Sequence, residues 1–409
     1  MSSKQNIVGF LDDVTNTRIY GWALVQNQET AVAITLKFND QEIITLLAQV
    51  LRHDVVDAGL HPTGYCGFDL DLQKEGIELP PNCKVQVYAG EAQVELVNSP
   101  WFYYSDAYLT EIQEETAVIK FDEDDKKILI LGMGKSGTSI LTYRIADVDA
   151  NIKVYFEPYT TQCLNHIEFH RKIYRKYDSY ITKALYYPQY PQQLALVGGY
   201  YNKKVCIIRD PRDLLISTFF YSWNKSDNPP HDKFPAALKL VLQKEKEPQA
   251  VDFTTLLAIR PEVPTSILDS VQNLCDLTNN LGEDWHILKY EDFVTNKVTG
   301  LNAYLGFPIN LEASVPGQLK RVERSKKFDN WRRWFTENDV QHLKPQLDNY
   351  LACLNYDPDD WTLAANPQLS PSEGSEYMTK IFAPPPKKGL DALKNALASS
   401  SLGKRFRNL

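Results

Sequence analysis

The residues with the clearest chemical potential form the stretch GKSGTS at positions 134–139. Glycines allow a sharp bend, and backbone N–H groups at the start of a helix converge on an anion. The ammonium group of Lys135 adds a full positive charge, and Ser136, Thr138 and Ser139 add hydroxyl groups. We therefore predict a loop that cradles a phosphate group. A tight turn without a ligand is the alternative, because glycine and serine are common in turns.

A strand before this loop and a helix after it would hold it in place. Residues 128–131 form a short apolar run, typical of a strand buried in a parallel sheet, and residues 140–148 are amphipathic with helical spacing. The nucleoside triphosphatase motif G-x-x-x-x-G-K-[ST] would require glycine at Leu129. The loop therefore differs from the usual one of that class.

A second strand, turn and helix repeats this arrangement further along the chain. A strand at 204–208 leads into the basic turn RDPRD at 209–213 and then into an amphipathic helix that runs to Trp223. The predicted fold is α/β, with a P-loop-type parallel sheet flanked by helices. Further strands of this sheet are expected at 153–156, 180–183 and 285–290.

The N-terminal part, residues 1–104, has a different character. Short runs of β-forming residues alternate with Asn, Asp, Gly and Pro, which predicts an all-β sandwich domain. Trp22 is expected in its core, although with Tyr20 it could form a platform for a carbohydrate. An acidic connecting segment, 105–126, leads into the α/β domain at 127–364.

Two further segments show few periodic runs. Residues 224–264 suggest an insertion that lies over the site, as lids do. Residues 365–409 are rich in Pro and Ser and end in a basic cluster, which predicts a linker and a mobile tail. Docking of that tail on a partner or a membrane surface is a weaker alternative.

The composition limits the classes of function. A formal net charge of -8 over 409 residues argues against a general nucleic-acid binder. The six cysteines are scattered without a C-x-x-C pair, which predicts reduced core residues and no metal site. No signal peptide and no apolar run long enough to span a membrane is recognisable, so we expect a cytoplasmic protein without a transmembrane segment.

Three motifs, in the same order, resemble those of sulfotransferases that use 3′-phosphoadenosine 5′-phosphosulfate (PAPS). The stretch 134–139 is similar to their 5′-phosphosulfate loop, and the stretch 205–217 resembles their 3′-phosphate element. The stretches RSKKFDNWRRWF, from Arg324, and KYED, from Lys289, are similar to two supporting motifs of the cytosolic branch. The resemblance implies PAPS as donor, 3′-phosphoadenosine 5′-phosphate (PAP) as product, and no metal.

The resemblance also assigns roles to individual residues. Lys135 is implied to be catalytic and to touch the bridging oxygen of the donor, while Arg209 and Ser217 hold the 3′-phosphate. Ile140 replaces the Trp that stacks on adenine in the cytosolic branch, so the adenine contact is left open. The implied donor-binding residues are Gly134, Lys135, Ser136, Gly137, Thr138, Ser139, Arg209, Ser217, Tyr290, Arg324 and Lys326.

The catalytic base is assigned by comparison between branches of the family. The cytosolic branch uses a His two residues after a Lys, and Leu185 stands in that place here. Golgi-type and tyrosylprotein members use a Glu about twenty residues after the loop, a place that Glu157 occupies. We therefore predict Glu157 as the base, with Lys183 balancing the sulfuryl charge. A structural glutamate is the alternative, and His166 and His170 are lower-ranked candidates for the base.

These observations predict an enzyme that transfers a sulfuryl group from PAPS to an acceptor hydroxyl. Residues 1–104 resemble an accessory β-module found beside bacterial sugar-modifying transferases, so we expect the acceptor to be a carbohydrate or glycolipid. One alternative is a P-loop nucleotide or small-molecule kinase, which would need ATP and magnesium. The other is a non-catalytic carbohydrate-binding protein.

Overall fold

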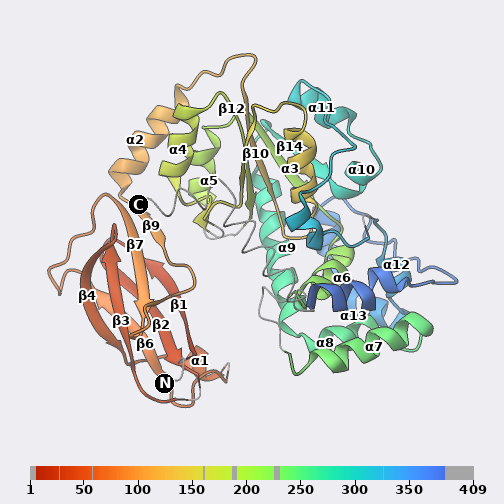
Figure 1. The fold of residues 1–409 in the computed structure, drawn as a ribbon, viewed down its shortest axis with the longest axis horizontal. Coiled ribbons are helices and arrows are strands. Elements are labelled where there is room, and N and C mark those ends of the chain that lie inside the picture. The colour runs from red at the N-terminus through yellow and green to blue at the C-terminus, as the bar shows by residue number, and fades with distance from the viewer. Residues whose placement is uncertain are drawn as a thin grey trace, which may run out of the picture. The chain divides into compact units, whose positions relative to one another are not determined.

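The computed structural model describes residues 6–26, 28–57, 59–159, 162–186, 191–224, 231–325 and 327–382. The chain divides into two compact units (Figure 1). The first unit comprises Met1–Leu131 and Asp149–Val205, and the second comprises Gly132–Val148 and Cys206–Leu409. The boundaries of the four segments expected from the sequence remain predictions.

The N-terminal part of the first unit consists of antiparallel sheets, which confirms its predicted β character. One sheet has the strand order β1-β2-β6-β5, and the other has β4-β3-β7-β8 with β9 paired to β7. The packing of the sheets as a sandwich remains a prediction. The strands are β1 (Ile7–Val14), β2 (Arg18–Val25), β3 (Val32–Phe38), β4 (Gln41–Ala48), β5 (Val50–Leu51), β6 (Tyr65–Asp71), β7 (Asn82–Ala89), β8 (Val94–Glu95) and β9 (Trp101–Tyr104).

Local sequence explains how these strands form and pair. Asn39 and Asp40 join β3 to β4 with positive φ angles of 49° and 71°, the left-handed conformation that a two-residue hairpin turn requires and that Asn and Asp tolerate. Leu11, Ile34 and other apolar residues of both sheets belong to one buried cluster. Trp22 packs against a smaller cluster and stays partly exposed.

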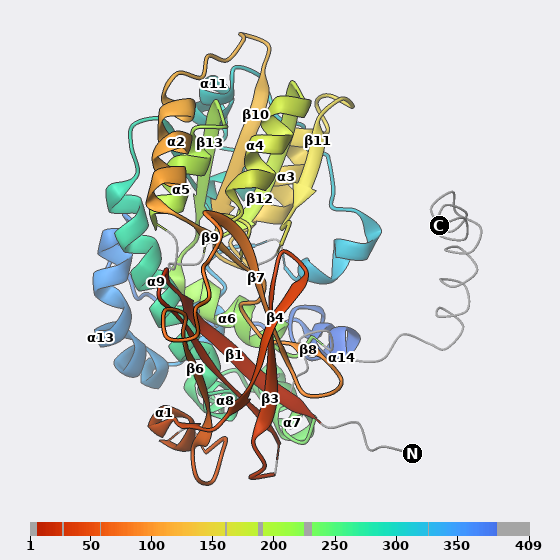
Figure 2. The same cartoon turned by 90° about the vertical axis from the view of Figure 1, so that its left-hand side faces the viewer.

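A five-stranded sheet has the strand order β11-β12-β10-β13-β14, and β11 pairs with β12 in parallel. All five strands lie where the sequence predicts them, and β10 is buried from its second residue onward. Figure 2 shows α2, α4 and α5 side by side in the first unit. The elements are β10 (Lys126–Gly132), β11 (Lys153–Phe156), β12 (Ser179–Leu185), β13 (Lys203–Ile208), β14 (Trp285–Lys289), α1 (His53–Asp57), α2 (Asp106–Ala117), α4 (Ile167–Lys176) and α5 (Pro191–Gly198).

The second unit is mainly helical around α6, which is buried along most of its length. The buried residues of α6 include apolar side chains such as Leu215 and Phe219 and also polar ones, among them Asp213, which pair within the protein. The helices of this unit include α9, whose apolar face contributes Val271 and Leu274 to its core. The helical elements are α3 (Thr138–Ala146), α6 (Pro211–Tyr221), α7 (Phe234–Lys246), α8 (Phe253–Ile259), α9 (Glu262–Asn280), α10 (Tyr290–Val294), α11 (Thr299–Leu305), η3 (Gly317–Val322), α12 (Trp331–Trp334), α13 (Glu337–Cys353), η4 (Pro371–Glu373) and α14 (Ser375–Phe382).

The segment 224–264, expected as an insertion over the site, is largely helical where the structure describes it, and its role as a lid stays a prediction. It contains α7 and α8, and the first backbone N–H groups of α8 donate to the Asp339 carboxylate, at 2.7 Å from Phe253 N and 2.8 Å from Thr254 N. Asp339 also closes the capping box of α13 with Thr336. One buried carboxylate therefore holds the starts of two helices, which the local sequence pattern could not reveal.

The start of the predicted tail is also structured. In α14, Tyr377, Met378 and Ile381 are buried, and the Glu373 carboxylate lies 2.5 Å from the Lys327 ammonium. The prediction of a mobile segment from residue 365 is therefore wrong for residues 371–382. The rest of the predicted tail, residues 383–409, lies outside the described residues. Within the described ranges, no helix has both the length and the apolar character to cross a membrane.

Candidate functional site

Two glycines, Gly132 and Gly137, shape the path of the chain between β10 and α3, because a side chain at either position would clash with its neighbours. Gly137 has a φ of 97°, and a Cβ atom there would lie 2.6 Å from the Tyr290 ring. A Cβ atom at Gly132 would lie 2.6 Å from the Ile207 carbonyl oxygen. The loop backbone therefore packs closely against Tyr290 and the end of β13. Gly137 is the N-cap of α3, and because glycine has no side chain, no side-chain oxygen at this position caps the first N–H groups of the helix.

The polar side chains of this loop differ in what they contact. Lys135, with a φ of 68°, donates from Nζ to the Val322 carbonyl oxygen at 2.7 Å, and its ammonium lies 4.1 Å from the centre of the Tyr221 ring. The hydroxyl of Ser136 is buried and donates to the Met133 carbonyl at 2.7 Å. Ser136 thus supports the loop internally. Gly134 is exposed, and Ser139 is half-buried beside the buried Thr138.

Arg209 follows β13 and joins the second turn to the loop. Its guanidinium is buried, donates from Nη1 to the Lys135 carbonyl oxygen at 2.9 Å, and lies 4.2 Å from the centre of the Tyr290 ring. Asp213 lies 3.5 Å away and is fully buried. The Nε atom of Arg209 is buried and has no hydrogen-bond partner among the described residues. A buried donor without a partner costs free energy, so it marks a place where a ligand atom could bind.

Arg324 lies near Arg209 and has two buried donor nitrogens without a hydrogen-bond partner among the described residues. It donates from Nη1 to the Glu373 carbonyl oxygen at 2.9 Å, whereas its buried Nε and Nη2 atoms have no hydrogen-bond partner within the described part of the chain. Burial, and next the charge of Arg209, lower the pKa of Arg324 to about 10. Cations outnumber carboxylates here. The charged groups around Arg324 are the cations of Arg209, Arg324, Lys327 and Arg333 and the carboxylates of Asp213 and Glu373.

Ser217 lies two turns along α6 from the basic turn and is buried. Tyr290 begins α10, and burial raises the pKa of its phenol. The structure therefore brings together, within the second unit, the loop, Arg209 and Tyr290. The remaining predicted residue, Lys326, lies outside the described residues.

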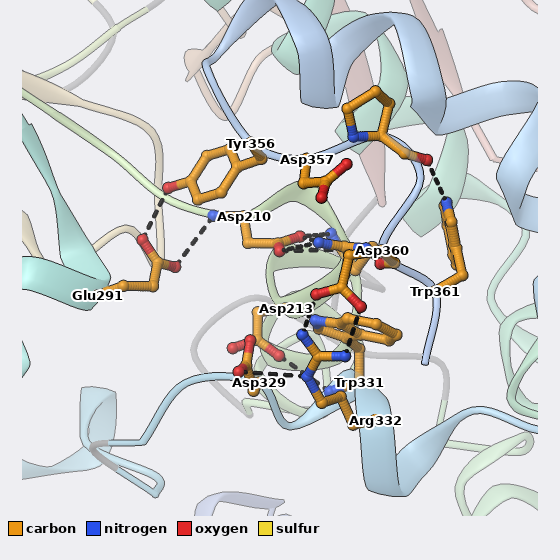
Figure 3. A network of polar contacts seen from close by, with 12 residues as sticks. Asp210, Asp213, Glu291, Asp329, Trp331, Arg332, Tyr356, Asp357, Asp360 and Trp361 are labelled. Atoms are coloured by element: carbon orange, nitrogen blue, oxygen red, sulfur yellow. Dashed lines mark hydrogen bonds and ion pairs between the residues drawn. The ribbon is translucent and has the colours of Figure 1, made fainter. Parts of the chain in front are cut away.

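A polar network fixes the turn after β13 (Figure 3). Glu291 accepts from the backbone N–H of Asp210 at 3.2 Å and from the Tyr356 hydroxyl at 2.7 Å. Burial raises the pKa of Glu291 to about 7, opposed by the Tyr356 hydrogen bond. The Asp210 carboxylate accepts from Arg212, at 2.7 Å from Nη2, so it is already committed to an ion pair. Sequence reasoning missed this network, although the motif KYED contains Glu291.

Glu157 and Lys183 belong to the first unit, and the structure brings these two predicted residues together. Glu157 follows β11 with a φ of 47°, its backbone N–H donates to the Lys183 carbonyl at 2.8 Å, and its carboxylate forms an ion pair with the Lys183 ammonium. The Lys183 side chain is only 2% exposed, whereas that of Glu157 is 31% exposed. Burial lowers the pKa of Lys183.

The two histidines that are alternative candidates for the base, His166 and His170, are engaged in contacts with neighbouring side chains. The ring nitrogens of His170 lie 2.6 Å from the Tyr201 hydroxyl and 2.8 Å from the Cys163 carbonyl oxygen, and the side chain is fully buried. The ring of His166 stacks on that of Phe102 with centres 3.7 Å apart. Burial lowers the pKa of His166 to about 3 and that of His170 to about 4. Both rings are therefore neutral at neutral pH; His170 is packed in the interior, whereas His166 is half-buried and lines a cavity of the first unit.

The cysteines and acidic residues form no recognisable metal site within the described ranges. All six cysteines are free thiols, and five of them are buried. No group of three or more His, Cys, Asp and Glu side chains suited to a metal ion occurs among the described residues.

Comparison with known proteins gives one family and a set of solved structures that includes the two below. A family profile described as a sulfotransferase domain matches residues 125–346. A crystal structure of mouse sulfotransferase SULT7A1 complexed with PAP is 16% identical, with a TM-score of 0.39, and the match covers 63% of this chain and 96% of that one. An acetyl xylan esterase, Est2A, from the rumen bacterium Butyrivibrio proteoclasticus is 10% identical, with a TM-score of 0.12, and the match covers 70% and 87%. No curated protein matches the chain.

Proposed function

The chain belongs to the sulfotransferase domain family, and we propose that it transfers a sulfuryl group from PAPS to a hydroxyl group of a carbohydrate or glycolipid. Sulfuryl transfer needs two things from the protein: a site that holds a donor with two separate phosphate positions, and a group that removes the proton of the acceptor hydroxyl. The second unit supplies a candidate for the first need, and Glu157 in the first unit is the candidate for the second.

The observation that carries the proposal is the pair of guanidinium groups beside the loop. Arg209 and Arg324 together have three buried donor nitrogens without hydrogen-bond partners in the described chain, Nε of each and Nη2 of Arg324. Arg209 also donates to the loop at the Lys135 carbonyl. An anion here would satisfy these donors and offset the excess positive charge. The 3′-phosphate of PAPS has the required charge, while its 5′-phosphosulfate would bind the loop at the start of α3.

Each of the residues proposed for the site then has a defined role. When bound, PAPS supplies a sulfuryl group attached to a phosphate leaving group. The ammonium of Lys135 and the N–H groups of the loop stabilise the negative charge that develops on the bridging oxygen as its bond to sulfur breaks. The acceptor oxygen forms the new bond to sulfur, and its proton passes to the Glu157 carboxylate. Lys183, paired with Glu157, keeps this carboxylate in place.

A calorimetric titration of the full chain tests the proposal. We expect PAP to bind in the presence of EDTA, and ATP to bind more weakly whether or not magnesium is added, since ATP lacks a 3′-phosphate for Arg209 and Arg324. The control is 5′-AMP, which has only the phosphate for the loop. Binding of ATP that requires magnesium and exceeds binding of PAP would contradict the proposal and favour phosphoryl transfer. Absence of PAP binding would refute it.

A further inference from the structure

A cavity of about 650 Å³ opens in the first unit, on the side of α4 and β11. This volume is within the range of sites for small molecules, roughly 300 to 1,000 Å³. Its lining is both aromatic and basic, and none of the roles assigned above uses it. The residues that matter for its chemistry are Tyr155, Tyr159, Phe169, Tyr177, Lys172 and Lys176.

The aromatic part of the lining is built from rings in edge contact with Phe169. The Phe169 ring centre lies 5.2 Å from that of Tyr155 and 5.7 Å from that of Tyr159. Tyr159 is 49% exposed and has a φ of 58°, a left-handed conformation that is uncommon for a bulky residue. One edge of the Tyr159 ring packs on the buried Phe102, with ring centres 5.8 Å apart, while about half of the residue stays exposed at the cavity, so a ligand can contact the exposed part.

The basic part of the lining contains charges that the protein does not neutralise. Lys172 and Lys176 are exposed and one turn apart on α4, and neither forms an ion pair with a carboxylate in the described part of the chain. By contrast, Arg171, on the same helix, lies 2.5 Å from Glu115. Glu168 also lines the cavity and lies 3.6 Å from Arg171. Two unpaired ammonium groups in a chain of formal net charge -8 favour an anionic ligand.

We propose that this cavity binds an acidic saccharide portion of the acceptor. The C–H faces of a pyranose ring are apolar and can pack on the tyrosine rings, while the lysines bind its carboxylate or ester anion. Tyr155 and Tyr159 each stand two residues from Glu157, so a saccharide held by them lies along the segment that carries the proposed base. The inference rests on the proposed function and narrows its acceptor from any carbohydrate to an anionic one.

The experiment measures saccharide binding to the full chain by calorimetry, without donor. The probe is a tetrasaccharide that contains glucuronic acid, and cellotetraose is its neutral counterpart. We expect the acidic tetrasaccharide to bind. The double variant Lys172→Glu/Lys176→Glu should raise the Kd for the acidic tetrasaccharide at least about tenfold, and so should Tyr159→Ser. The reason is that charged contacts and stacking contacts each contribute enough binding free energy to change Kd by about that factor. Both variants should bind PAP as the unaltered chain does.

The matched control is Lys74→Glu/Lys120→Glu, which makes the same change in net charge at exposed positions elsewhere in the first unit. It should leave tetrasaccharide binding unchanged. If both double variants lose tetrasaccharide affinity equally, only the net charge of the chain matters and the proposal is overturned. Binding of cellotetraose as tight as that of the acidic tetrasaccharide would also overturn it. If oligothymidylate binds more tightly than the acidic tetrasaccharide and its binding depends on the same lysines, the cavity binds a nucleic acid and the saccharide proposal is overturned. If PAP binds and the tetrasaccharide does not, the cavity proposal fails alone; if PAP does not bind, the proposed function fails.

Discussion

Arg324→Met should stabilise the unliganded chain and weaken its binding of PAP. The buried Nε and Nη2 atoms of Arg324 have no partners in the described chain, and each unsatisfied donor costs about 1 to 3 kcal/mol. Methionine removes both donors with a side chain of similar length. It also removes the hydrogen bond from Nη1 to the Glu373 carbonyl, which contributes about 0.5 to 1.5 kcal/mol and leaves that carbonyl without this donor. At the midpoints of these ranges the two donors account for about 4 kcal/mol, against about 1 kcal/mol for the lost hydrogen bond and about 2 kcal/mol for the carbonyl left without its donor, so we expect a net gain in the free energy of unfolding on the order of 1 kcal/mol.

The same substitution should cost about 1.5 to 3 kcal/mol in PAP binding, or roughly ten- to 150-fold in Kd, because a charge-assisted hydrogen bond to the 3′-phosphate is lost. Binding of 5′-AMP should change little. The assays are urea denaturation of the unliganded chain and calorimetric titration with both nucleotides. The control is Arg332→Met, because Arg332 donates to the Asp360 carboxylate and to the Thr362 carbonyl at 2.8 Å and is thus satisfied (Figure 3). It should destabilise the chain and leave PAP binding intact. A destabilised Arg324→Met variant with an unchanged ratio of PAP to 5′-AMP affinity would refute the reasoning.

Three further predictions concern the loop, the network and the base. Gly137→Ala should lower the melting temperature, since its Cβ would lie 2.6 Å from Tyr290 at a φ of 97°, whereas Gly134→Ala, with nothing within 4 Å, should not; equal melting temperatures would contradict the loop packing. The folded-state pKa of Glu291, about 7, lies above its ordinary value of 4.5, so the stability that this group contributes is complete below about 4.5 and is lost as the pH rises through 7. Between pH 4.5 and 7 the free energy of unfolding of the unaltered chain should therefore fall, relative to that of Glu291→Gln, by up to about 1.4 kcal/mol per pH unit. Urea denaturation at several pH values measures it, and the same pH dependence in both proteins would contradict the assignment. Glu157→Gln should retain PAP binding and lose about two to four orders of magnitude in single-turnover rate. Because this change also leaves the Lys183 ammonium buried without its ion pair, the double variant Glu157→Gln/Lys183→Met should recover melting temperature but not rate, and recovery of both would make Glu157 a structural residue.

The sequence predicted the elements that local pattern determines. The apolar run 128–131, the glycines after it and the amphipathic run 140–148 correspond to β10, the loop and α3, because burial period and turn chemistry are encoded within a few residues. The β-rich character of the N-terminal part, in which α1 is a short exception, and the strands of the parallel sheet were predicted for the same reason and are confirmed. The free cysteines likewise agree with their scattered spacing.

What the sequence could not predict depends on contacts between distant segments. The hydrogen bonds of Glu291 to Asp210 and Tyr356 join three separate stretches of chain. Glu373 lies in a Pro- and Ser-rich stretch that predicted a linker, yet it pairs with Lys327 and Arg333. The unsatisfied donors of Arg209 and Arg324 become visible only when every neighbouring acceptor is placed. Composition describes a segment's average character, and a few buried ion pairs and apolar side chains can override it.

Transfer of labelled sulfate tests the central claim most directly. The full chain is incubated in EDTA with PAPS that carries ³⁵S and with the acidic tetrasaccharide, and both the label in the saccharide and the PAP released are measured over time. The proposed function predicts that label enters the saccharide in an amount equal to the PAP formed. It also predicts that Lys135→Ala slows this transfer more than it weakens PAP binding, because the lysine acts on charge that develops during the reaction. Release of PAP without labelled product in the presence of acidic, neutral and lipid-linked saccharides, or an unchanged rate in Lys135→Ala, would contradict the account.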